Sequence, residues 1–140
     1  MNLQHLGKVD KGWGFEIVFA NNEKYCGKLL IFEKAGAKTS LVFHKEKAKS
    51  WFINAGKFKI KFIDVASGEM KEAILEEGKT ADFGALGPHQ VEALVDNSII
   101  FEVGTGDYVE DRFRLAPGDT QTKPSAQSLD LHSYHHRGTE

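Results

Sequence analysis

Apolar and polar residues alternate along most of this chain with a period of two rather than the period of a helix. The clearest example is Lys57–Phe62, where Phe58, Ile60 and Phe62 alternate with lysines. Because successive side chains of a strand point to opposite faces, this pattern places the apolar side chains in a core and the lysines in water. We therefore expect a strand with one buried face at this position.

Similar short segments recur along the chain, separated by turn residues such as Asn21-Asn22, Ala35-Gly36 and Ser67-Gly68. Strands are predicted over residues 16–20, 25–33, 39–44, 49–55, 57–62, 69–75, 89–95 and 99–103, with a further extended stretch from 78 to 83. No amphipathic helix is predicted before residue 105. Many short strands joined by turns indicate an all-β sandwich or barrel. Residues 16–20 are expected at an edge, where they could pair with a second copy.

Length and charge narrow the classes of function. The 140 residues are enough for one domain with a real core. A net charge of −2 without a basic stripe argues against nucleic acid or an anionic membrane as a partner. Cys26 is the single cysteine, which excludes an intrachain disulfide and suggests a reducing compartment. Residues 1–10 lack the apolar run of a signal peptide, so we expect a cytoplasmic protein.

Composition changes near residue 116. Residues 1–115 are predicted to form the barrel, and residues 116–140 a polar C-terminal tail or docking arm, because the latter begin with a linker-like run rich in Pro, Thr and Ser. The tail carries His132, His135 and His136, a spacing that could bind a surface metal or supply ligands at the barrel mouth.

Five segments, in order, resemble the motifs of small cupins related to bacterial phosphomannose isomerases. They are Lys11-Gly-Trp13-Gly14-Phe-Glu16, residues 25–31, residues 40–56, residues 78–93 and residues 101–115. In the fourth segment Gly78, Pro88 and His89 match the family pattern, while Gly84 and Leu86 replace its Pro and Gly. The resemblance covers about residues 8–115 and implies a cupin double-stranded β-helix, the jelly-roll barrel.

The same resemblance implies a degenerate metal site. Metal-binding cupins use two His and one Glu from the first motif and one His from the second. Here Val42 stands at the first His, His44 at the second, Lys49 at the Glu, and His89 at the His of the second motif. Transition metals normally need at least three protein ligands. An ammonium in place of the carboxylate would also repel a cation, so we predict no resident metal.

The preferred hypothesis is a barrel that binds a small anionic metabolite, such as a sugar or sugar phosphate. His44, Lys49 and His89 would hold the anion, and Trp51 would pack against a sugar face. Similar proteins are commonly homodimers, which we also expect here.

Several alternatives stay open. One is a metal-dependent enzyme resembling mannose-6-phosphate isomerase, with a divalent metal on His44 and His89 and further ligands from elsewhere. In another, Lys49 acts as a base or forms a Schiff base. In a third, Lys49 reaches the barrel mouth or pairs with a carboxylate (Glu16, Glu92 or Glu102), and both histidines are core residues. The last is a scaffold whose interior is filled by side chains.

Structural roles are also predicted for the tryptophans and for the end of the last matched segment. Trp13 and Trp51 could line a carbohydrate site, but a tryptophan in a small all-β domain is more often a core residue. Asp111 and Arg114 resemble an ending of the family that closes the barrel, and we expect an ion pair between them.

Overall fold

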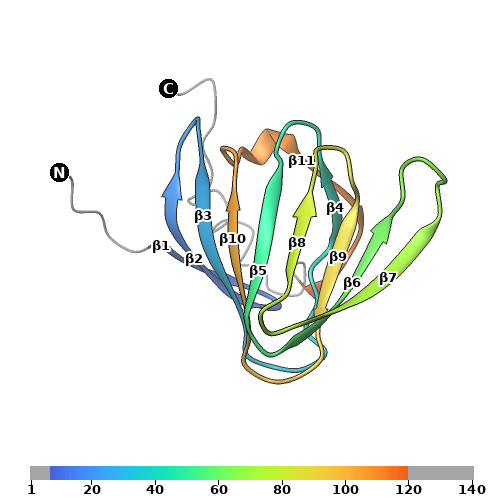
Figure 1. The fold of residues 1–140 in the computed structure, drawn as a ribbon. Helices are drawn as coiled ribbons and strands as arrows, with labels where there is room; N and C mark the ends of the chain where they lie inside the picture. Colours follow the sequence, from blue (N-terminus) through green and yellow to red (C-terminus); the bar gives the residue numbers. More distant parts are fainter. Residues whose placement is uncertain (1–6, 120–140) are drawn as a thin grey trace.

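A computed structural model of the chain describes residues 7–119. These residues form two antiparallel sheets that face each other, with most loops gathered at the two ends (Figure 1). The strands are β1 (Gly7–Lys11), β2 (Gly14–Asn21), β3 (Cys26–Phe32), β4 (Leu41–His44), β5 (Lys49–Ala55), β6 (Lys57–Ile63), β7 (Met70–Glu76), β8 (Thr80–Phe83), β9 (His89–Ala93), β10 (Ser98–Gly104) and β11 (Arg112–Ala116). A 3₁₀ turn, η1 (Val109–Asp111), precedes β11.

One sheet has the strand order β1-β2-β3-β10-β5-β8, and the other β11-β4-β9-β6-β7. The predicted all-β jelly roll is therefore confirmed. Two strands were not predicted, β1 and β11. Because β1 lies outside β2, residues 16–20 form an inner strand, and their predicted place at an edge is wrong. The homodimer stays a prediction, without that edge as its basis.

The alternation in Lys57–Phe62 places the side chains as predicted. Phe58 and Ile60 are buried in the core, and Phe62 packs against it. The lysines of β6 face outward and pair across the sheet with glutamates of β7 (Lys57–Glu76 at 3.6 Å, Lys61–Glu72 at 3.9 Å) and β9 (Lys59–Glu92 at 3.9 Å). Such exposed pairs contribute at most about 1 kcal/mol each, so burial of the apolar face holds this strand in place.

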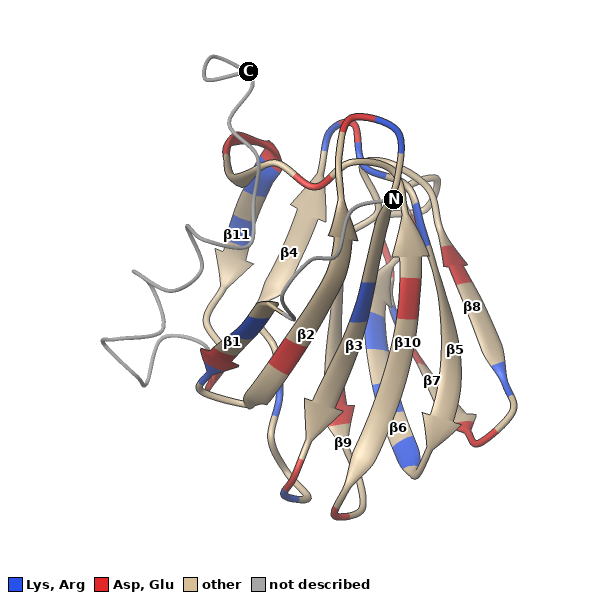
Figure 2. Ribbon diagram, turned by 90° about the vertical axis from the view of Figure 1, so that its left-hand side faces the viewer, with Lys and Arg blue, Asp and Glu red and all other residues tan. Residues whose placement is uncertain are grey.

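The barrel interior has an apolar end and a charged end, set by the register of β3, β10 and β5. Near one end Leu30, Ile100 and Ile53 face one another across the strands, and the ring of Phe32 stacks on Trp13 at 4.4 Å. Two residues further along, the facing positions are Lys28, Glu102 and Trp51. Figure 2 shows charged positions within β1, β2, β3 and β10 themselves. The period of two that buries the core therefore also carries charges inward.

No helix within residues 7–119 is long and apolar enough to cross a membrane. The predicted tail falls almost wholly outside the described residues, and so do its three histidines.

Candidate functional site

A cavity of about 80 Å³ opens into the charged end of the barrel. Side chains from both sheets line it: Lys11, Trp13, Glu16, Lys28, Leu30, Thr39, Ser40, Val42, His44, Lys47, Lys49, Trp51, His89, Glu102, Arg112 and Arg114. All four residues predicted to form the site, His44, Lys49, Trp51 and His89, are among them. Because the cavity is present, the interior is not filled by side chains as a pure scaffold would require.

Glu102, on β10, is at the centre of a buried group of charges. Its Oε1 accepts a hydrogen bond from Nε1 of Trp51 at 2.8 Å, and its Oε2 accepts one from Lys47 at 3.0 Å. The Lys49 ammonium lies 3.7 Å from Oε1, beyond good hydrogen-bonding distance. These cations hold the pKa of the Glu102 carboxyl well below its usual range in spite of its burial.

Asp107 lies behind the cavity wall and balances two of the lysines. Its carboxylate is 2.7 Å from Nζ of Lys28 and 3.4 Å from Nζ of Lys47. Burial opposes the charged state of both amines, but their carboxylate neighbours outweigh it and raise the pKa of each. Lys28 and Lys47 are therefore permanent cations at neutral pH.

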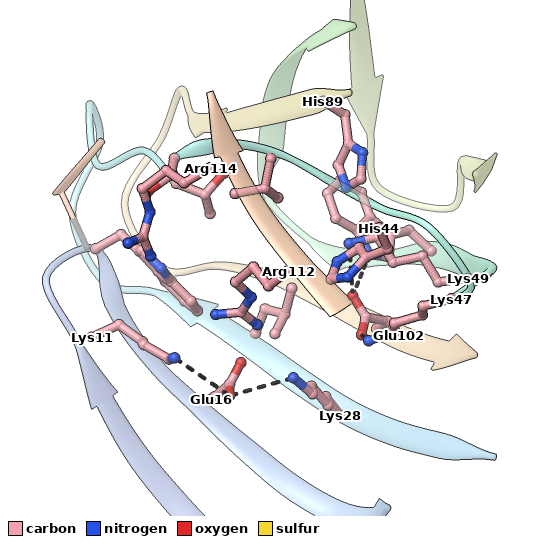
Figure 3. A pocket seen from close by; sticks show the side chains of 16 residues that line it. Lys11, Glu16, Lys28, His44, Lys47, Lys49, His89, Glu102, Arg112 and Arg114 are labelled. Carbon is pink, nitrogen blue, oxygen red and sulfur yellow. Dashed lines mark hydrogen bonds and ion pairs between the residues drawn. The ribbon is translucent and has the colours of Figure 1, made fainter. Parts of the chain in front are cut away.

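Glu16 forms a second ion-pair group with lysines of neighbouring strands. Its Oε1 is 3.5 Å from Nζ of Lys28 and 3.8 Å from Nζ of Lys11 (Figure 3). The pKa of Lys11 is nevertheless lowered to about 7, because burial outweighs the attraction of Glu16. Lys11 therefore changes its charge within the physiological pH range.

Lys49 points into the cavity, as the family register implies. Its amine contacts the faces of Trp51 and Phe83, at 5.2 and 5.9 Å from the ring centroids. Burial lowers its pKa to about 8, against the attraction of Glu102. Of the three carboxylates considered as partners in the sequence, Glu102 is the one that contacts Lys49. Lys49 can therefore pair with Glu102 and still present its amine to a ligand in the cavity.

The two histidines line the cavity as neutral imidazoles, each hydrogen-bonded to a backbone carbonyl. Nδ1 of His44 donates to the carbonyl of Asp111 at 3.1 Å, and Nδ1 of His89 donates to the carbonyl of Gly87 at 2.8 Å. A carbonyl can only accept, so the proton is on Nδ1 and each Nε2 carries a lone pair. Burial, followed by repulsion from Lys49, lowers the pKa to about 2 for His44 and about 3 for His89.

This tautomer changes how an anion can bind. The role of His44 and His89 in holding the anion stays a prediction, but in this tautomer Nε2 has no proton to donate to the oxygen of a phosphate or carboxylate. The side chains able to do so are the lysines and arginines. Trp51 is 3% exposed, and its ring is contacted by Phe83, His89 and Lys49, so its packing against a sugar face stays a prediction.

Arg112 and Arg114 line the cavity and were not recognised as site residues. In the pairing of β11 with β4, Arg112 is opposite His44 and Arg114 is opposite Val42.

The expected ion pair between Asp111 and Arg114 is absent from residues 7–119. Asp111 instead accepts hydrogen bonds from the backbone N–H groups of the loop before β5, at 2.8 Å from Lys45 and 3.0 Å from Lys47. Nε of Arg114 donates to Oγ of Ser40 at 3.1 Å.

The donor set does not fit a divalent transition metal. Among residues 7–119 no group of three or more His, Cys, Asp or Glu is arranged to hold one. His44 and His89 supply two imidazoles, while Val42 has no donor atom. The Lys49 ammonium, near enough to lower the pKa of both imidazoles, is a cation already in place.

In sequence the chain matches no protein-family model and no curated protein. In structure it is similar to the capsular polysaccharide assembling protein CapF from Staphylococcus aureus, with a TM-score of 0.69 and 18% identity over 81% of this chain and 35% of that one. Oxalate decarboxylase from Bacillus subtilis matches with a TM-score of 0.69 and 17% identity, over 82% of this chain and 33% of that one. KdgF from Halomonas sp. matches with a TM-score of 0.57 and 16% identity, over 69% and 81%.

The chain therefore spans about a third of the length of CapF and of the decarboxylase. These neighbours are cupin-fold proteins, and the chain has the cupin fold. The Bacillus subtilis decarboxylase has Mn(II) centres, which contrasts with the donor set described above.

Proposed function

We propose that this cupin barrel binds a small anionic metabolite, such as a sugar phosphate, without a resident transition metal. The observation that carries the proposal is the charge of the cavity wall. Six basic side chains line the cavity (Lys11, Lys28, Lys47, Lys49, Arg112 and Arg114), against two carboxylates (Glu16 and Glu102). Asp107, behind the wall, adds a third carboxylate.

An excess of positive charge in an enclosed site favours an anionic occupant. Two unit charges about 4 Å apart interact by about 4 kcal/mol at the effective dielectric of a protein surface, so one divalent anion offsets a large part of this repulsion. A transition metal would add to it. The metal-dependent isomerase stays the alternative, and it requires donors beyond those of residues 7–119. Metal analysis of protein purified without an affinity tag separates the two, since a stoichiometric transition metal would favour the enzyme.

The affinity for sulfate should fall as the pH rises from about 6 to about 9. Sulfate stays a dianion over this range, so the change must come from the protein. Lys11, with a pKa of about 7, and Lys49, with a pKa of about 8, lose their protons in this window. Losing one nearby charge should weaken binding about tenfold, or about 1.4 kcal/mol. Titration calorimetry at constant ionic strength measures the dissociation constant at each pH.

Matched variants identify the titrating groups. Lys11→Met should flatten the lower part of the pH profile, whereas Lys59→Met, on the outer face of β6, should leave it unchanged. Absence of sulfate binding at every pH, or a dissociation constant that does not change with pH, would contradict the proposal.

A further inference from the structure

The two ends of the cavity have opposite hydrogen-bonding character. Figure 3 shows Lys11, Arg112 and Arg114 together at one side and His44, His89 and Lys49 at the other. Arginines carry donors alone, whereas Nε2 of each neutral imidazole is an acceptor. A ligand that satisfies both ends therefore has acceptor oxygens at one end and a donor at the other.

His89 gives the strongest indication of the missing donor. Its side chain is 4% exposed, and its Nε2 has no hydrogen-bond partner among the described residues. The hydrogen bond from Nδ1 to Gly87 and the stacking of its ring on Phe83 at 4.5 Å fix the orientation of that lone pair. Leaving such an acceptor unsatisfied costs about 1–3 kcal/mol. An O–H group of a ligand would remove this cost.

At the arginine end of the cavity, strand pairing fixes the distance between Arg114 and His89. Arg114 on β11 pairs with Val42 on β4, and Val42 pairs with His89 on β9. Directly paired residues share one face of a sheet, so Arg114 and His89 flank Val42 on the cavity side. Their backbones are two strand spacings apart, about 10 Å. Within the described residues Arg114 contacts the hydroxyl of Ser40 and no carboxylate.

Building on the proposed function, we infer that the ligand is a hydroxylated phosphate or carboxylate held in one orientation. Its anionic group lies between Arg112 and Arg114, and a hydroxyl group donates a hydrogen bond to Nε2 of His89. Val42, short and apolar, leaves the space between them for the carbon chain. The corresponding histidine of a metal cupin would fill it.

Two phosphates of the same chain length test this orientation. Glycerol 3-phosphate carries hydroxyl groups, and n-propyl phosphate has the same carbon skeleton without them. We expect the wild-type protein to bind glycerol 3-phosphate about tenfold more tightly, the effect of one buried hydrogen bond. Titration calorimetry gives both dissociation constants. Equal affinities would overturn the inference and leave anion binding intact, whereas no binding of either phosphate would overturn the proposed function as well.

Two variants test which residue binds the hydroxyl group of the ligand and which binds its phosphate. His89→Phe should remove the preference for glycerol 3-phosphate, and Arg114→Gln should weaken both ligands by a similar factor while keeping the preference. A preference that survives in folded His89→Phe would overturn the assignment. Should this variant not fold, nitrogen-15 NMR of the wild-type protein decides: the Nε2 resonance of His89 should shift with glycerol 3-phosphate and not with propyl phosphate. An Nε2 resonance that does not respond would overturn the assignment in the same way.

Discussion

The double variant Val42→His/Lys49→Glu should bind Zn²⁺ at least a thousandfold more tightly than the wild-type protein. Val42 and Lys49 both line the cavity, and Val42 is paired directly with His89. With His44 and His89 already presenting Nε2, the two substitutions complete a set of three imidazoles and one carboxylate. They also remove the ammonium that repels the metal. Four-ligand zinc sites are stabilised by about 10–16 kcal/mol, so a thousandfold gain, about 4 kcal/mol, is a conservative expectation.

Stability provides the measurement. Without metal, the new carboxylate at position 49 would lie near Glu102, since the Lys49 amine that it replaces is 3.7 Å from that residue. The variant should therefore melt below the wild-type temperature as the apoprotein and rise above its own apo value with Zn²⁺. Val42→Leu/Lys49→Glu is the matched control, because it carries the same charge change with no new imidazole. Titration calorimetry or a thermal melt that shows no gain over this control would contradict the geometry of the site.

The fold could be predicted from the sequence because the period of two decides which face of a strand is buried. Phe58 and Ile60 alternate with lysines, and their burial follows from that pattern alone. β1 was missed because Gly7–Lys11 shows no run of alternating apolar residues. It is a strand because it pairs with β2 along its whole length, from Gly7–Val18 to Lys11–Gly14. Such long-range pairing leaves little trace in local composition.

About half of the residues of the site could also be predicted from the sequence. His44, Lys49 and His89 were placed by motif spacing, but Arg112, Arg114 and Lys47 were not. The signal that could have found Lys28 and Glu102 is a charge at an inward position of an apolar strand. Lys28 alternates with Cys26 and Leu30 on the buried face of β3. Lys47 has no such signal, since its loop reads as solvent-exposed and is drawn inward by Asp111 and Glu102, residues far away in sequence.

Glu102→Gln should destabilise the protein by about 3–5 kcal/mol, the cost of leaving buried charges without their partner. Glu102 is 3% exposed and compensates both Lys47 and Lys49. Glutamine keeps the shape and can still accept the hydrogen bond from Trp51, so the substitution removes charge and little else. Urea unfolding followed by the fluorescence of the buried tryptophans measures the loss.

The matched control is Glu72→Gln, which breaks the exposed pair with Lys61 and should cost at most about 1 kcal/mol.

The pH dependence of stability separates the effect of the lost charge from any effect on packing. Burial already holds the pKa of Lys49 at about 8, and without Glu102 this pKa should fall further below the unfolded value of 10.5. The unfolded state then binds more protons, so the variant should recover stability as the pH rises toward about 10. In the wild-type protein the raised pKa of Lys47 acts in the opposite sense and stabilises the fold below 10.5. A loss no larger than that of Glu72→Gln, or one unchanged by pH, would mean that Glu102 does not compensate these lysines.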